Sequence, residues 1–352
     1  SMVLGYGHDD RICAYTSLMA QLEAENVKRT AVCLLVDKEE VGSQGATGMH
    51  SMFFENFVAE VMECMGDYSA LSVKRAMMNS TMLSSDVSAA HDPIYASASG
   101  TVKAIEPRRV AVGDMVNSIV IENDGAFEEV SYTPCEDVTA LSKEEIIGKV
   151  KEAGVVGMGG AGFPTHVKLS PKEPEKIEYI IANCAECEPY LTADYRRMLE
   201  NPEELIGGMK IILQIFDKGV FGIENNKPDC IEKLQELVKD EPRIEVCPLE
   251  TKYPQGGERQ LIYAVTGRSI NSKMLPADAG CIVDNVETII AIYNAVKLGK
   301  PVTNRISTIT GDAVEHPGNF LYNIGTSYQE LVDAAGGFKV QPEKIISGGP
   351  MM

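Results

Sequence analysis

The sequence predicts an α/β multidomain protein whose largest part is a mostly parallel sheet covered by helices on both faces. From Ser142 onward, apolar runs such as IEYIIANC, GVFGIEN and RIEVCPL alternate with amphipathic helical stretches. Strands that alternate with helices are typical of parallel sheets, because a parallel connection needs a crossover segment. Glycine-rich or polar turns accompany these runs, and such sheets bind their ligands at the carboxyl ends of the strands.

The segments before this region have a different pattern. Residues 1–93 predict an α/β fragment, with a helix and a buried strand over 10–36 and helices over 52–65 and 69–79. Residues 94–140 predict a small β unit, because ASASGTVKAI, MVNSIVIEN and EEVSYT alternate with a period of two between glycine turns.

Two further parts follow along the chain. Residues 141–302 predict the α/β domain, which begins with a capping box formed by Ser142 and Glu145. Residues 303–352 predict a β-rich unit that encloses the helix SYQELVDAAG.

Composition excludes some classes of function. The net charge of −19 argues against a nucleic-acid partner, because phosphate binding needs a basic surface. The sequence has no apolar run long enough to cross a bilayer, so we expect no direct membrane insertion. The nine cysteines are scattered, mostly within apolar runs, which favours reduced thiols in the cytoplasm over a disulfide framework.

The first candidate site is a glycine-rich loop, GVVGMGGAGFPTHVK. Glycines let the backbone approach a flat or anionic ligand and turn its amides toward it, while Lys168 can add a charge for a phosphate. A loop of this kind is also common as a simple turn. The glycines concerned are Gly157, Gly159, Gly160 and Gly162.

The second candidate, NCAECEPYLTADYRR, directly follows a predicted strand. Asn183, Glu186 and Glu188 offer an amide and two carboxylates for hydrogen bonds to ribityl, ribose or carboxamide groups. The alternative is an acidic turn with solvated side chains. Cys184 and Cys187 form a CxxC pair, but one such pair alone does not predict zinc or a cluster.

Two more clusters lie further along the chain. YPQGGERQLIYAVTGR enters a predicted helix through glycines, an arrangement that suits an anion or a polarised ring edge. In VDNVETIIAI, Asn285 ends an apolar run before another helix. Each of these polar residues could instead be a helix cap.

In order along the chain, these four clusters resemble the flavin-binding subunit of complex I-type dehydrogenases. Residues 96–352 resemble more specifically the C subunit of Rnf electron-transport complexes, through seven motifs in register: ASASGTVKAIEPR, GAGFPTHVKL, AECEPYLTADYR, YPQGGERQLIYAVTGR, LPADAG, VDNVET and SGGPMM. The resemblance implies that the unit at 94–140 is a partial lipoyl-like β unit. It also implies that the unit at 303–352 is a β-grasp domain of the soluble-ligand-binding-like type.

The resemblance also implies cofactors. FMN would be cradled by Gly157, Gly159, Gly160, Gly162 and Lys168, with Asn183, Glu186, Tyr253, Gly257 and Asn285 around it. NADH would stack over the flavin and contact Phe163, Glu188 and Glu258. Protein partners would be the other subunits of a membrane electron-transport complex and, indirectly, ferredoxin, so the chain would be cytoplasmic and peripheral to the membrane.

Two features depart from the family pattern. Ala185 replaces an acidic residue and Gly257 replaces a Glu of the complex I relatives, which leaves nicotinamide affinity open. The ferredoxin-like cysteine runs of the family do not occur before Met352, so we expect no iron–sulfur cluster in this chain.

The N-terminal residues resemble a different family. GYGHDDRICAYTSLMAQLEA, TAVCLLVDKEEVGSQGATGMHS and MLSSDVSAAHDP resemble zinc-dependent aspartyl aminopeptidases. The resemblance implies Asp9, Glu40 and Asp86 as metal ligands and Glu39 as the general base. The family's two histidine ligands have no counterpart here, so zinc would meet an incomplete site.

The chain therefore resembles a chimera joined between Pro93 and Ala96. A natural fusion, a misassembled gene and an engineered chimera remain open. Besides the flavoprotein, two alternative functions remain, a zinc-dependent aspartyl aminopeptidase and a truncated module without catalysis.

Overall fold

The computed structural model describes residues 53–66, 68–78, 93–109, 115–160, 162–271 and 274–349. Contacts divide the chain into two units, residues 1–91 with 271–273 and residues 92–270 with 274–352. In the first unit, α2 (Phe53–Cys64) and α3 (Ala70–Met78) confirm the helices predicted over 52–65 and 69–79. The helix and strand predicted over 10–36 lie outside the described residues.

The second unit contains the predicted parallel sheet. Its strands are β3 (Tyr179–Cys184), β4 (Gly219–Glu224), β5 (Ile244–Leu249) and β6 (Cys281–Asn285). They lie in the order β5-β4-β3-β6, and every neighbouring pair is parallel. The mixed α/β class with a parallel sheet is therefore confirmed.

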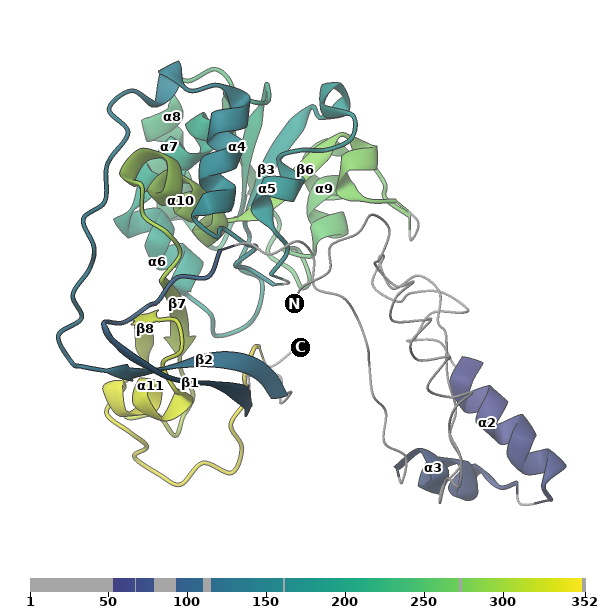
Figure 1. The fold of residues 1–352 in the computed structure, drawn as a ribbon. Helices are drawn as coiled ribbons and strands as arrows, with labels where there is room; N and C mark the ends of the chain where they lie inside the picture. Colours follow the sequence, from purple (N-terminus) through teal and green to yellow (C-terminus); the bar gives the residue numbers. More distant parts are fainter. Residues whose placement is uncertain are drawn as a thin grey trace. The chain divides into compact units, whose positions relative to one another are not determined.

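Helices cover both faces of this sheet. The larger core lies between one face and the first group of helices, and the smaller core lies under α9 on the opposite face (Figure 1). Because side chains alternate along a strand, Ile180 and Ala182 point into the larger core and Ile181 into the smaller one. The first group comprises α4 (Lys143–Glu152), α6 (Ala193–Glu200), α7 (Pro202–Ile212), α8 (Pro228–Val238) and α10 (Val286–Tyr293), while α9 is Glu258–Thr266.

Local signals in the sequence explain where α4 begins and how closely α7 packs against α10. Ser142 and Glu145 form the predicted capping box at the start of α4. Gly208 lets α7 approach α10 closely, because a Cβ there would lie 2.1 Å from the carbonyl oxygen of Ile289. The described residues of the second unit also include short helical elements: η2 (Val138–Ala140), α5 (Thr165–Lys168), η3 (Pro174–Lys176), η4 (Pro276–Ala279) and η5 (Asn294–Leu298).

Two small antiparallel pairs flank the α/β part in sequence. β1 (Gly100–Arg109) pairs with β2 (Met115–Asn123), and β7 (Asn304–Ile309) pairs with β8 (Gly318–Asn323), which is followed by α11 (Tyr328–Ala334). The strand predicted from EEVSYT is wrong, since residues 128–133 are irregular. Alternation alone does not make a strand; the backbone also needs a hydrogen-bonding partner.

Candidate functional site

The order of the strands creates a switch point between β3 and β6. The chain proceeds from β3 outward to β4 and β5, then returns to place β6 on the other side of β3. Loops leaving β3 and β6 therefore diverge at their carboxyl ends, and α/β sheets bind ligands at such points. Asn183 and Asn285, both predicted site residues, are register partners on these two strands.

The glycine-rich loop contacts the end of β6. A Cβ at Gly159 would lie 2.7 Å from Cβ of Asn285, so only glycine fits this close approach. The backbone amide of Met158 donates a hydrogen bond to Thr288 Oγ1 at 3.0 Å. The first and fourth sequence clusters thus form one surface.

The second and third clusters meet in the same way. Asn183 Nδ2 donates to the carbonyl of Gly256 at 2.8 Å, and the amide of Gly256 donates to Cys187 Sγ at 3.1 Å. The turn after β3 is therefore held against the start of α9. Tyr253 is also close to Glu188: removal from water raises the pKa of the Tyr253 hydroxyl, and the Glu188 carboxylate raises it further.

Glu186 takes a structural role within this turn. Its carboxylate accepts hydrogen bonds from the amides of Asp194 at 2.8 Å and Tyr195 at 3.1 Å, at the start of α6. It thereby satisfies helix donors that Thr192, the residue at the N-cap, leaves without a side-chain acceptor. Burial raises the pKa of Glu186, although these two hydrogen bonds and Lys227 oppose the shift.

Asp284 is an acidic side chain that the sequence reasoning missed. Its side chain is fully buried, with Oδ1 3.3 Å from Lys168 Nζ, while Oδ2 has no hydrogen-bond partner. Lys168 also donates to the carbonyl of Val283 at 2.9 Å. Burial raises the pKa of Asp284, Lys168 lowers it, and Glu258 raises it again, which places these three charges near one another. A charged residue inside the apolar run CIVDN was the signal available.

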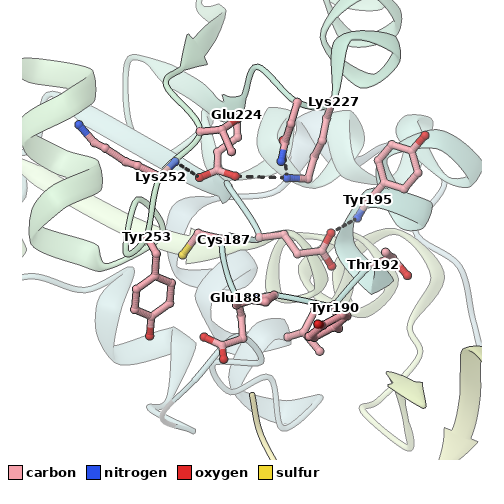
Figure 2. Close-up of a pocket in the computed structure, with 14 residues that line it drawn as sticks. Cys187, Glu188, Tyr190, Thr192, Tyr195, Glu224, Lys227, Lys252 and Tyr253 are labelled. Atoms are coloured by element: carbon pink, nitrogen blue, oxygen red, sulfur yellow. Dashed lines mark hydrogen bonds and ion pairs between the residues drawn. The ribbon is translucent and has the colours of Figure 1, made fainter. Parts of the chain in front are cut away.

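A cavity of about 370 Å³ opens beside the turn after β3. Figure 2 shows Glu224 between Lys252 and Lys227 on its wall. Lys227 Nζ donates to the carbonyl of Ala185 at 2.6 Å and to Asn226 Oδ1 at 3.1 Å, and it lies 3.6 Å from the Glu224 carboxylate. Sequence reasoning passed over this buried ion pair because charges after a strand usually face solvent.

The remaining predicted residues lie at the edge of this arrangement. Gly160, Gly162 and Phe163 are exposed, with open space where a Cβ of either glycine would lie, and Gly157 closes the loop by donating to the carbonyl of Phe163 at 2.8 Å. Gly257 is the N-cap of α9 and Glu258 its first residue. The peptidase-like residues Asp9, Glu39, Glu40 and Asp86 lie outside the described residues.

Fold and site define a parallel α/β domain of the kind that binds nucleotides or flavins at a switch point. Residues 150–294 match the family model described as the Nuo51 FMN-binding domain. Residues 306–352 match the SLBB domain, and residues 1–113 match the aminopeptidase I zinc metalloprotease (M18) family. The last match extends beyond the predicted boundary at residue 93.

Curated relatives are consistent with the match to the Nuo51 FMN-binding domain. The chain is 48% identical over 262 residues to the C subunit of the proton-translocating ferredoxin:NAD(+) oxidoreductase complex of Clostridium ljungdahlii, covering 74% of this chain and 57% of that protein. It is 45% identical over 263 residues to the C subunit of the Na(+)-translocating ferredoxin:NAD(+) oxidoreductase complex of Acetobacterium woodii, covering 74% and 59%. The chain therefore spans less than two thirds of the length of these relatives.

A solved structure has a similar fold. The NAD+-reducing [NiFe]-hydrogenase in its air-oxidized state superposes with a TM-score of 0.50 at 25% identity, covering 58% of this chain and 41% of the hydrogenase chain. Within the described part of this chain, no helix is both long and apolar enough to span a bilayer. The described residues also include no group of three or more His, Cys, Asp or Glu side chains placed to hold a metal ion.

Proposed function

We propose that this chain is the FMN- and NADH-binding segment of an Rnf-type C subunit, within a complex that transfers electrons between NADH and ferredoxin. The observation that carries the proposal is the convergence of four separate sequence clusters at the β3–β6 switch point. The identities of 48% and 45% to the C subunits of two ferredoxin:NAD(+) oxidoreductase complexes support it.

The residues fit a flat, polar cofactor. Gly159 brings the loop backbone directly against the Asn285 side chain, and the space beside the neighbouring Gly160 is open, so a planar group can approach the backbone there. The buried Oδ2 of Asp284 lacks a donor, which an N–H or O–H group of a ligand would supply. Lys168 adds a positive charge for a phosphate or a reduced ring.

In this proposal each cluster has a defined role. Gly157, Gly159, Gly160, Gly162 and Lys168 cradle FMN, while Asn183, Glu186, Tyr253, Gly257 and Asn285 surround it. Phe163, Glu188 and Glu258 contact NADH. Bound FMN would supply hydride acceptance from NADH and single-electron release, and the chain's own residues would orient both cofactors.

The partners and the domain layout follow from the same proposal. The segment would dock on other subunits of a membrane electron-transport complex and stay peripheral to the membrane on the cytoplasmic side. Residues 94–140 would be the partial lipoyl-like unit, 141–302 the cofactor domain and 303–352 a β-grasp-like unit.

The test is an absorbance spectrum of the purified chain after FMN addition and desalting. Retained flavin absorbance at about one FMN per chain, bleached by anaerobic NADH, is the expected result. A protein that emerges colourless, with unchanged folding by circular dichroism, would overturn the assignment.

A second function has one specific observation in its favour, the match of residues 1–113 to the M18 family. It would make the chain a chimera whose N-terminal fragment carries Asp9, Glu39, Glu40 and Asp86. We expect no hydrolysis, because a two-metal site with four carboxylates and no histidine pair leaves ligand positions open. Chelator-sensitive release of an N-terminal aspartate, lost in Glu39→Gln, would establish the peptidase instead.

A further inference from the structure

Asp284 is a buried acid whose carboxyl group is only partly paired. It is the second-last residue of β6, and its register partner on β3, Ala182, is uncharged. Alternation along the strand points it to the same face of the sheet as Ile282, toward the larger core. Its side chain is fully buried, and Oδ2 has no hydrogen-bond partner in the described part of the chain. A carboxylate in such a place is stable only while a cation stays beside it.

Lys168 of α5 is that cation. Its Nζ lies 3.3 Å from Asp284 Oδ1 and donates to the carbonyl of Val283 at 2.9 Å. An ammonium has three donors, so within the described residues these two acceptors leave one N–H for a ligand. The lysine side chain is 26% exposed, whereas that of Asp284 is 0% exposed. A ligand can therefore reach the cation, but solvent cannot hydrate the carboxylate.

A second carboxyl group, that of Glu258 on α9, acts on the same pair. Desolvation raises the pKa of Asp284, Lys168 lowers it and Glu258 raises it; Lys168 likewise lowers the pKa of Glu258, which desolvation raises. One lysine thus serves two carboxyl groups. A phosphate beside it, with a charge of about −2, would add more negative charge than the lysine can neutralise. Like charges favour the neutral form of the acid that water reaches least, which is Asp284.

We propose that Asp284 and Lys168 form a proton-coupled phosphate site: when Lys168 Nζ pairs with the phosphate of FMN, the Asp284 carboxylate takes up a proton from solvent and becomes a neutral acid. The proton forms an O–H bond at Oδ1, the oxygen beside the lysine, and Oδ2 remains an acceptor for a donor of the ligand. The inference rests on the proposed function and deepens it, because it adds a change of charge at Asp284 to the binding of FMN.

Calorimetry measures the proton uptake directly. The full chain is titrated with FMN at about pH 7.5, where the phosphate is a dianion, in several buffers of different ionisation enthalpy and without inorganic phosphate. The dependence of the heat on the buffer should give about one proton taken up per FMN, and the affinity should fall with rising pH by up to about tenfold per pH unit. Riboflavin, which has the ring and the ribityl chain without the phosphate, should bind without proton uptake.

Matched variants locate the proton. Asp284→Asn keeps the shape of the side chain and should bind FMN without proton uptake, with an affinity that no longer falls in this way as pH rises. Asp217→Asn removes an exposed carboxylate outside the site and should behave like the wild type. Glu258→Gln tests the other carboxyl group. Uptake that is lost in Glu258→Gln and kept in Asp284→Asn would place the proton on Glu258 and overturn the inference.

Infrared spectra test the pair without FMN. In the free wild type at about pH 7.5 the lysine should keep Asp284 ionised, so the band of a protonated carboxyl group should be no stronger than in Asp284→Asn. Lys168→Met removes the cation and should add this band, which should be missing again when Asp284→Asn is combined with it. A band from Asp284 in the free wild type, or none in Lys168→Met, overturns the inference.

The two assays distinguish the two ways to fail. A wild type that binds no FMN contradicts the proposed function, while the infrared comparison still tests the charge of Asp284. Binding of FMN without proton uptake, or equal uptake with riboflavin, overturns the inference and leaves the proposed function standing.

Discussion

Asn285 Nδ2 donates a hydrogen bond to Asp194 Oδ2 at 2.7 Å, joining residues 91 positions apart in the chain. At its other end, Asn285 Oδ1 accepts the amide of Glu287 at 2.9 Å and caps α10. Both ends of the amide are thus used, which fixes its orientation at the switch point. Asp194 in turn lies at the start of α6, beside Glu186. This contact ties the fourth sequence cluster to the second.

Stability should fall as pH rises through the titration of Asp194. Desolvation, with Glu186 nearby, raises the pKa of Asp194 from 3.8 to about 7, although the bond from Asn285 opposes the shift. The folded chain therefore keeps a proton that the unfolded chain releases, so this group's contribution to the free energy of unfolding declines between about pH 4 and pH 7. In Asp194→Asn the side chain is neutral at every pH, so the free energy of unfolding should lose this contribution to its pH dependence.

Urea unfolding of both proteins at about pH 5 and about pH 8 measures the effect. The variant should gain stability relative to the wild type at the higher pH. A difference between the two proteins that is the same at both values would show that Asp194 titrates near its ordinary pKa.

Gly159→Val should prevent FMN retention. A side chain there would collide with Asn285, whose Cγ and Nδ2 would each lie 2.8 Å from the new Cβ. The loop or Asn285 must then move, and the proposed cradle closes. Gly148→Ala on α4 is the control, because its Cβ would meet nothing within 4 Å. Flavin absorbance after desalting should fall to background only in Gly159→Val; retention equal to wild type would remove this loop from the site.

Lys227→Met should destabilise the chain by about 3 kcal/mol, because it leaves the buried Glu224 carboxylate without its cation. Lys218→Met is the matched control, since Lys218 pairs with Glu245 at 2.8 Å at the surface and should change stability by less than about 1 kcal/mol. Urea unfolding of both variants gives the comparison. The double variant Lys227→Met with Glu224→Gln should recover part of the loss. Equal losses in the two lysine variants would contradict a special role for the buried pair.

The buried thiols should resist alkylation in the folded chain. Burial raises the pKa of Cys184 well above its usual value, that of Cys230 to about 12 and that of Cys281 to about 11. Only the thiolate reacts, and these side chains are also inaccessible. Iodoacetamide at about pH 8, followed by peptide mass spectrometry, should label exposed Cys64 at once and these three only after denaturation. Rapid native labelling of Cys184 would contradict the burial described.

Much of the α/β part could be read from the sequence, because its signals are local. The alternation of apolar strands with amphipathic helices predicted β3, β4, β5 and the helices α7 and α8, while α6 lies in the stretch that was interpreted as a polar turn. The capping box at Ser142 was also correct, since it depends on two residues within one turn. The same local reasoning failed at residues 128–133, where a strand-like pattern has no partner strand.

The sequence by itself determined which segments would carry the candidate site: the glycine loop and the polar turns after β3 and β6. Only the tertiary structure decided how their side chains are used. It made Glu186 the cap of α6, left Asp284 buried with a free acceptor oxygen, and joined Asn285 to Asp194. Burial and hydrogen-bond partners depend on segments far apart in the chain, and strand order sets which of them meet.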